Sequence, residues 1–175
     1  PQHTWHPPSV EYVSGAYRLT LVSCDPFLVT FGGDAGCSGT CSFIYETACF
    51  GHGTKISSPN GMINIEDLVV GETVYDAYMN LVTVTEVIHS VADVILTLSD
   101  ESGDTTQVTP EHPFISEDGE SFIIAGNLTT SHTVHRGKRI LSVIAKYQPT
   151  KVVNLTVSGS HTFIANKFSV HNKGR

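Results

Sequence analysis

The chain lacks long apolar runs and has few basic residues. Its 175 residues contain no stretch of about 18 apolar residues, so no membrane-spanning helix is expected. Ten lysines and arginines stand against 17 acidic residues, which gives a net charge of −7, and the basic residues are scattered. A nucleic-acid surface needs clustered basic side chains. We therefore expect neither a membrane nor a nucleic acid as a partner, and we read the basic stretch 136–139 as a solvated turn.

The chain also lacks the helical pattern of an ordinary globular protein. No amphipathic helix of usual length occurs between residues 49 and 172, and residues 66–68 allow one helical turn at most. Apolar and polar residues instead alternate over short segments that are separated by polar turns. This predicts an all-β domain. Strands are expected in a hairpin around Ser58–Gly61, within 69–75 where a turn leads into a strand, on both sides of Gly159 within 152–166, and at 82–88, 93–99, 105–109, 121–124 and 140–147.

Residues 1–48 differ from the rest in texture. They carry four of the eight prolines, the glycine-rich stretch 32–36 and a single basic residue, Arg18. Short strands are predicted at 17–22 and 27–31, but so few residues do not usually build a core of their own. We expect a flanking segment, the end of an upstream protein. The start at Pro1 suggests a fragment of a longer precursor.

Four cysteines lie in the first third of the chain, at positions 24, 37, 41 and 49. Their spacing matches no zinc ribbon or finger, and it does not settle the cellular compartment. Two alternatives stay open, a disulfide among Cys24, Cys37 and Cys41 or a metal-binding module that uses all four. Our main prediction includes no cofactor and no metal. Cys49 is the best candidate to remain a thiol, because it has a chemical context.

That context is the peptide bond between Ala48 and Cys49. A thiol that attacks the carbonyl of Ala48 forms a thioester, which is less stable than an amide, so the amide nitrogen must receive a proton. His112 is the expected proton donor, and Thr109 is placed to bond the same amide or to orient the imidazole. A single Cys in a β-domain is more often a small buried apolar residue.

A second reactive group stands near the end of the chain. The side-chain amide of Asn172 can attack its own backbone carbonyl, which closes a succinimide and breaks the next peptide bond if neighbours assist proton transfer. His161 and His171 are the candidate assistants. The ordered co-occurrence of Cys, Thr-x-x-His, a histidine-bearing hairpin and His-Asn carries more weight than any single piece.

This order resembles the Hint superfamily, which includes inteins, bacterial intein-like domains and Hedgehog autoprocessing domains. Cys49–Thr54 looks like the opening block of the family, Thr109–Phe114 like its Thr-x-x-His block and 152–172 like its closing blocks. The resemblance covers 49–172, with 1–48 and 173–175 as flanking segments. It implies a flat disk or horseshoe with pseudo-twofold symmetry and with both ends close together at its centre. It also implies a single-turnover autocatalytic activity on the chain's own flanks, with Cys49 as nucleophile, Thr109 and His112 as its activators, Asn172 as the cyclising residue and His161 and His171 as its helpers.

Two positions depart from the splicing pattern. Lys173 follows Asn172, where splicing needs Cys, Ser or Thr to accept the acyl group, and Asn154 stands where many inteins have Asp. These departures favour the intein-like type, in which water or an external thiol or amine resolves the thioester. Cleavage before Cys49 and after Asn172 is therefore expected more than ligation, in a protein that acts as a monomer. A processing-inactive Hint-fold scaffold is the alternative.

Overall fold

The computed structural model describes residues 9–13, 16–20 and 48–172. The chain divides into two compact units, Glu46–Gly174 and Pro1–Tyr45 together with Arg175. In the smaller unit, β1 (Ser9–Val13) and β2 (Ala16–Thr20) form an antiparallel hairpin. The strand predicted at 17–22 overlaps β2, whereas β1 was not predicted. The segment 27–31 and the cysteines at 24, 37 and 41 lie outside the described residues.

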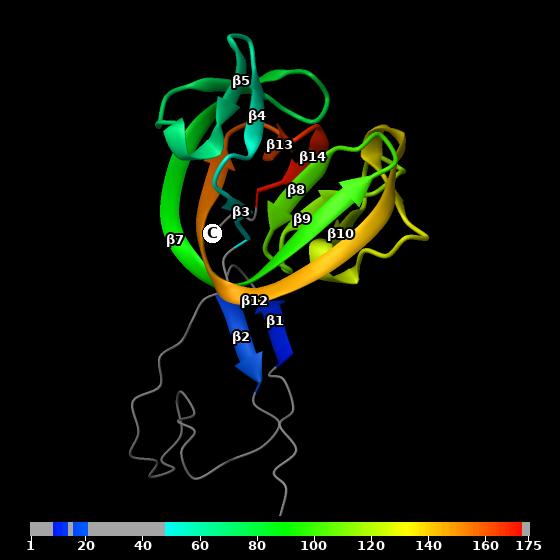
Figure 1. Ribbon diagram of the computed structural model, residues 1–175. Coiled ribbons are helices and arrows are strands. Elements are labelled where there is room, and N and C mark those ends of the chain that lie inside the picture. The colour runs from blue at the N-terminus through cyan, green and yellow to red at the C-terminus, as the bar shows by residue number, and fades with distance from the viewer. Residues whose placement is uncertain (1–8, 14–15, 21–47, 173–175) are drawn as a thin grey trace, which may run out of the picture. The chain divides into compact units, whose positions relative to one another are not determined.

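The larger unit is built from two six-stranded antiparallel sheets (Figure 1). The first has the order β10 (Phe122–Ile124), β9 (Pro113–Ile115), β14 (Phe168–His171), β13 (Thr162–Ala165), β4 (Lys55–Ser58) and β5 (Gly61–Asn64). The second has the order β11 (Thr133–Val134), β12 (Lys138–Val157), β3 (Phe50–Gly51), β8 (Thr105–Val108), β7 (Leu81–Asp100) and β6 (Thr73–Tyr75). The short 3-10 turns η1 (Ile65–Asp67) and η2 (Ala125–Asn127) each lead from the first sheet to the second, and η3 (His135–Gly137) lies between β11 and β12. The all-β prediction is confirmed, and no helix in the described ranges is long and apolar enough to span a membrane.

Two strands are longer than the sequence pattern indicated. The segments predicted separately at 82–88 and 93–99 form one strand, β7, and 140–147 continues to Val157 as β12. The two pair along almost their whole length and arc around the shorter strands (Figure 1). The prediction of separate strands was wrong, because no turn interrupts the chain between Leu81 and Asp100 or between Lys138 and Val157. Pro149, which has no N–H to donate, lies at the register shift between Tyr147 and Thr150, where the ladder is already broken.

The structure corrects the reading of residues 136–139 as a solvated turn at one position only: Arg136, Gly137 and Arg139 are exposed, but Lys138 is not. Lys138 begins β12, and only 10 % of its side chain is exposed. Its ammonium bonds the carboxylates of Asp100 and Asp104 and lies 4.6 Å from the ring centroid of Phe168. The paired carboxylates offset the cost of burying the charge. Lys138 therefore ties the β7–β8 turn to β14.

The apolar core includes residues from both sheets. Four phenylalanine rings are completely buried, at positions 50, 114, 163 and 168. Each contributes about 1.5–3 kcal/mol by leaving water. Phe50, Phe114 and Phe163 come directly after, or close to, positions to which the sequence assigns chemistry, so the core also fixes those positions.

The two halves of the domain repeat each other. The first N–H of η1, from Ile65, donates to the carbonyl of Thr54 at 2.8 Å, and the first N–H of η2, from Ala125, donates to that of His112 at 2.9 Å. Each 3-10 turn is closed by a leucine, Leu68 or Leu128. The halves are thus related by a pseudo-twofold operation that makes His112 the counterpart of Thr54.

Candidate functional site

Cys49 is held on both sides by Thr109. The backbone N–H of Cys49 donates to Thr109 Oγ1 at 2.9 Å, and the backbone N–H of Thr109 donates to the carbonyl of Cys49 at 2.9 Å. The Thr109 hydroxyl also lies 3.4 Å from that carbonyl oxygen. The pairing of Phe50 with Val108 explains this contact, because it aligns the residue before β3 with the residue after β8. The hydroxyl therefore touches the nitrogen of the bond between Ala48 and Cys49.

His112 lies in the core among aromatic rings. Its backbone N–H donates to the carbonyl of Thr109 at 3.2 Å, which closes a turn after β8. Its side chain is fully buried, with its ring centroid 4.3 Å from that of Phe50 and 6.2 Å from those of Phe114 and Phe163. The imidazole thus contacts the residue that follows Cys49, and little rotation is open to it in so closed a space.

The thiol of Cys49 has a mixed environment. The side chain is fully buried and packs in a small cluster with Ala92, Ile95 and Val152. The Sγ atom also lies 4.0 Å from the hydroxyl of Ser90 on β7, within reach of a weak hydrogen bond. Sequence reasoning missed Ser90, because a serine within an alternating strand carries no signal until β7 is paired with β12, the neighbour of β3.

Asn172 is fixed by two bonds to the hairpin that precedes it. Its backbone N–H donates to the carbonyl of His161 at 2.7 Å, and its Oδ1 accepts the backbone N–H of Val157 at 3.1 Å. The residue is fully buried. Its Nδ2 has no hydrogen-bond partner within the described part of the chain. The hydrogen bond to Oδ1 thus fixes the side-chain amide, while its Nδ2 makes no hydrogen bond to the described residues.

His161 stands next to this amide in an unusual backbone conformation. Its φ is +58°, in the left-handed region that favours glycine. Its Nδ1 lies 2.9 Å from the carbonyl oxygen of Val157. A carbonyl can only accept, so Nδ1 carries the proton and, in the neutral ring, Nε2 keeps its lone pair. In this tautomer Nε2 is the ring atom that can accept a proton.

His171, the last residue of β14, packs between two rings. Its centroid lies 4.7 Å from that of Phe122 and 6.3 Å from that of His161. Burial and the neighbouring His161 imidazole lower the pKa of His171 below its ordinary value, although a hydrogen bond with the Asn172 backbone opposes the shift. The neutral form of His171 is therefore favoured.

The residues around Cys49 and those around Asn172 both contact one short segment, 108–114. At its start, Val108 pairs with Phe50, next to Cys49, and at its end Phe114 pairs with Val170, two residues before Asn172. The strands concerned, β3, β8, β9 and β14, lie together near the middle of the domain (Figure 1). Residues 108–114, which include Thr109 and His112, therefore connect the two ends of the predicted domain.

The positions of the other predicted residues say less about their roles. Ala48 is buried, and Asn154 lies on β12 beside Val153, the partner of Phe50. Lys173 is outside the described residues. Among residues 48–172, no group of three or more His, Cys, Asp and Glu side chains is placed to hold a metal.

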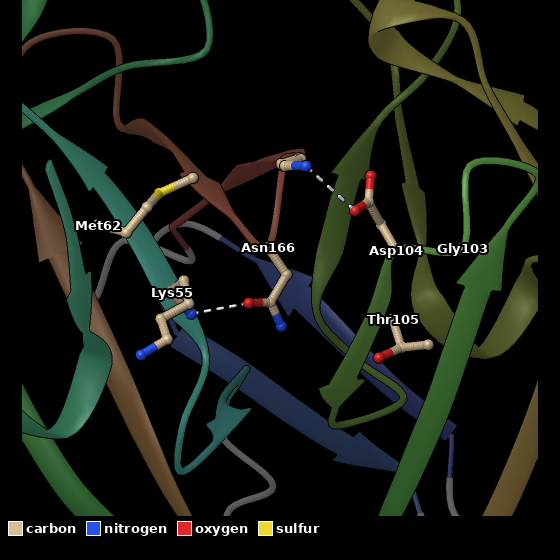
Figure 2. Close-up of a pocket in the computed structure, with 7 residues that line it drawn as sticks. Lys55, Met62, Gly103, Asp104, Thr105 and Asn166 are labelled. Atoms are coloured by element: carbon tan, nitrogen blue, oxygen red, sulfur yellow. Dashed lines mark hydrogen bonds and ion pairs between the residues drawn. The ribbon is translucent and has the colours of Figure 1, made fainter.

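A pocket of about 240 Å³ lies elsewhere on the domain (Figure 2). Lys55, Asn166 and Lys167 line one part of it, and Asp104 lines another. The side-chain oxygen of Asn166 accepts the backbone N–H of Lys55, and Lys167 pairs with Asp104. None of the residues assigned chemistry from the sequence lines this pocket.

Solved structures similar to this chain share its fold over more than two thirds of its length. The bacterial intein-like domain of Clostridium thermocellum is 26 % identical with a TM-score of 0.65, and the alignment covers 71 % of this chain and 98 % of that one. The gp41-1 intein is 26 % identical, with a TM-score of 0.62 and coverages of 71 % and 98 %. A DnaB intein from Synechocystis is 20 % identical, with a TM-score of 0.65 and coverages of 73 % and 100 %. No protein-family model and no curated protein sequence matches the chain.

The larger unit therefore has the Hint fold, the architecture of self-processing domains. More narrowly, it is an intein-like domain, as the sequence motifs predicted.

Proposed function

We propose that the domain 49–172 cuts its own chain at two peptide bonds, before Cys49 and after Asn172. The observation that best supports this is the bond between the Thr109 hydroxyl and the backbone nitrogen of Cys49, at 2.9 Å. That nitrogen is the leaving group of an acyl shift. The contact places a hydroxyl on the one atom that an acyl shift must release.

The first cut begins with an acyl shift. The Cys49 sulfur bonds to the carbonyl carbon of Ala48, the carbon–nitrogen bond breaks, and the nitrogen takes a proton to become the free amine of Cys49. His112 supplies this proton, and Thr109 holds the nitrogen in place. Water, or an external thiol or amine, then attacks the thioester, which releases the upstream segment and restores the thiol.

The second cut is a cyclisation of Asn172. Its Nδ2 bonds to its own carbonyl carbon, the bond to Lys173 breaks, and the proton lost by Nδ2 goes to the departing amine of Lys173. The hydrogen bond from Val157 to Oδ1 orients the amide, and His161 and His171 transfer the proton. The domain then ends in a succinimide.

Ligation of the flanks is disfavoured on chemical grounds. The standard route passes the acyl group to a hydroxyl or thiol at the position after Asn172, and Lys173 has neither. Its amine is protonated near neutral pH and is therefore a poor nucleophile. Separate cleavages are the expected outcome.

Mass spectrometry of the purified precursor tests the proposal. The wild type should yield fragments that end at Ala48, faster with added thiol or hydroxylamine, and fragments that end at Asn172. Cys49→Ala should abolish the first cut and leave the second, and Asn172→Ala should do the reverse. Cuts that persist in both variants would indicate an outside protease. A precursor that stays intact would favour a Hint fold kept as a scaffold.

A further inference from the structure

A buried carboxylate outside the predicted site is connected to both residues that flank His161. Asp76 lies in the turn between β6 and β7 and is only 2 % exposed. Its Oδ2 accepts the hydroxyl of Ser160 at 2.8 Å. On the other side of His161, the hydroxyl of Thr162 accepts the backbone N–H of Ala77, the residue after Asp76, at 3.0 Å.

The two hydroxyls are also bonded to each other, which closes a ring. Ser160 Oγ and Thr162 Oγ1 are 2.7 Å apart. Burial acts to raise the pKa of Asp76, but hydrogen bonds from Asn80, Ser160 and Tyr78 outweigh it and hold the pKa below its ordinary value. Asp76 is therefore ionised near neutral pH and can only accept.

The ionised carboxylate gives the ring a single direction. Ser160 must donate to Asp76, so the Ser160 oxygen accepts the proton of Thr162, and the Thr162 oxygen accepts that of Ala77. Every hydroxyl proton in this chain of bonds has one possible place. Such polarised, charge-assisted bonds are stronger than bonds between neutral groups.

Between the two clamped residues, His161 holds a conformation that it would not adopt readily alone. A left-handed φ costs a residue with a Cβ of order 1 kcal/mol or more, and it persists only where the surroundings impose it. The bonds from Asp76 to Ser160 and from Ala77 to Thr162 hold the residues on both sides of His161. The same backbone places the His161 carbonyl on the Asn172 N–H and the ring Nδ1 on Val157, which in turn bonds Asn172 Oδ1.

We infer that Asp76, acting through Ser160 and Thr162, is a positioning residue for the cut after Asn172. It touches neither reacting group but fixes the turn that carries His161. This inference rests on the proposed function, in which His161 assists cyclisation. It adds a residue on a different hairpin, one to which the sequence motifs assign no role.

The other end of β7 supplies a matched control. Asp100 opens a turn of the same design, since its Oδ1 accepts the backbone N–H groups two and four residues on, as that of Asp76 does. Its second oxygen binds Lys138 instead of Ser160. Asp100→Asn thus removes an equivalent buried charge without touching the His161 turn.

The test measures the cut after Asn172 in Cys49→Ala precursors, where the first cut is blocked. Asp76→Asn and Ser160→Ala should slow this cut by roughly tenfold to a hundredfold, the range for displacing a positioned catalytic group. Ser160→Thr, which keeps the hydroxyl, should restore most of the rate. Asp100→Asn should change it less than about threefold relative to its own folded fraction, and none of these should alter thiol-induced cleavage before an intact Cys49.

A spectroscopic readout separates positioning from mere stability. In the double variant Cys49→Ala, Asn172→Ala, in which both cuts are blocked, NMR of the imidazole nitrogens should show His161 with its proton on Nδ1, and Asp76→Asn should give a mixture of tautomers. Equal slowing by Asp76→Asn and Asp100→Asn, or an unchanged His161 spectrum, would overturn the inference. Failure of the wild type to cut after Asn172 would refute the proposed function instead, and the spectrum would still decide whether Asp76 fixes the ring.

Discussion

Cys49 and Asn172 are the first and last residues of the proposed domain in the sequence, and different kinds of groups surround them. Around Cys49 are hydroxyls, an apolar cluster and one imidazole enclosed by aromatic rings. Around Asn172 are two imidazoles, one exposed and one half-buried, and two backbone bonds. The proposed protonation of the Cys49 nitrogen would take place in a dry space, and the proposed proton transfers at Asn172 would take place near solvent. The two cuts should therefore respond differently to mutation and to pH.

The largest expected difference concerns His112. Replacing it with Gln, which nearly keeps its volume in the aromatic surroundings, should slow thiol-induced cleavage before Cys49 by about 10²–10⁴, the usual contribution of a general acid. The cut after Asn172 in the same protein should slow far less, because His112 is fully buried against Phe50. Both rates can be read from one mass-spectrometric time course. Equal losses at both bonds would mean that the ends share His112.

The next difference concerns pH. Because the pKa of His171 is lowered in the folded protein, the neutral imidazole persists below about pH 6.5, where a free histidine becomes charged. The cut after Asn172 should thus keep its rate somewhat below that pH and then fall at more acidic values. The same shift stabilises the fold above about pH 6.5, and this stability is lost as the pH falls through the lowered pKa. His171→Gln should slow the cut and remove this acidic limb, whereas His52→Gln, on the other side of Cys49, should leave the profile unchanged.

A smaller effect is expected at Thr109. Thr109→Val keeps the shape but loses the bond to the Cys49 nitrogen, and one hydrogen bond of about 1–1.5 kcal/mol corresponds to roughly a tenfold change in rate. Thr109→Ser, which retains the hydroxyl, should lose less. The measurement is thioester formation trapped with hydroxylamine. A Val variant as fast as the wild type would show that the backbone bonds suffice to hold Cys49.

The smallest effect is expected at Ser90. Its contact with the thiol is long, and thiols form weak hydrogen bonds, so Ser90→Ala should change the rate before Cys49 by about twofold and the rate after Asn172 not at all. The pH dependence of the first cut would report any change in the pKa of the thiol. A large loss in this variant would make the hydroxyl a main activator of Cys49.

Sequence motifs predicted the fold class and most of the residues that the structure gathers. The Cys49 and Thr-x-x-His blocks are local patterns, and their order along the chain was enough to indicate the Hint fold. Strand β14 was missed because the turn between β13 and β14 consists of Asn166 and Lys167, both with positive φ. Only the asparagine is typical of such a turn, so the sequence indicates the hairpin only weakly. The length of β7 and β12 was missed because alternation shows where strands run but not whether two of them are continuous.

The contacts of Ser90 and Asp76 could not be predicted from any local sequence pattern. Each acts on a residue far away in sequence, Ser90 across 41 positions and Asp76 across 84. The internal repeat, by contrast, was within reach. Leu68 followed by Thr73-Val74 recurs as Leu128 followed by Thr133-Val134 with the same spacing. A search for repeats would have predicted the pseudo-twofold symmetry from the chain itself.

The short pairings at the ends of the domain have a mechanical meaning. Tension applied through the flanks of a precursor enters at Phe50, which pairs with Val108, and leaves through Val170, which pairs with Phe114. These short contacts would give way first, because the ladder between β7 and β12, which Phe50 joins through Val153, is held by many more residue pairs. A pulled precursor should thus lose the alignment of its cleavable bonds well before the domain unravels, which would make its cutting sensitive to strain in whatever it is joined to.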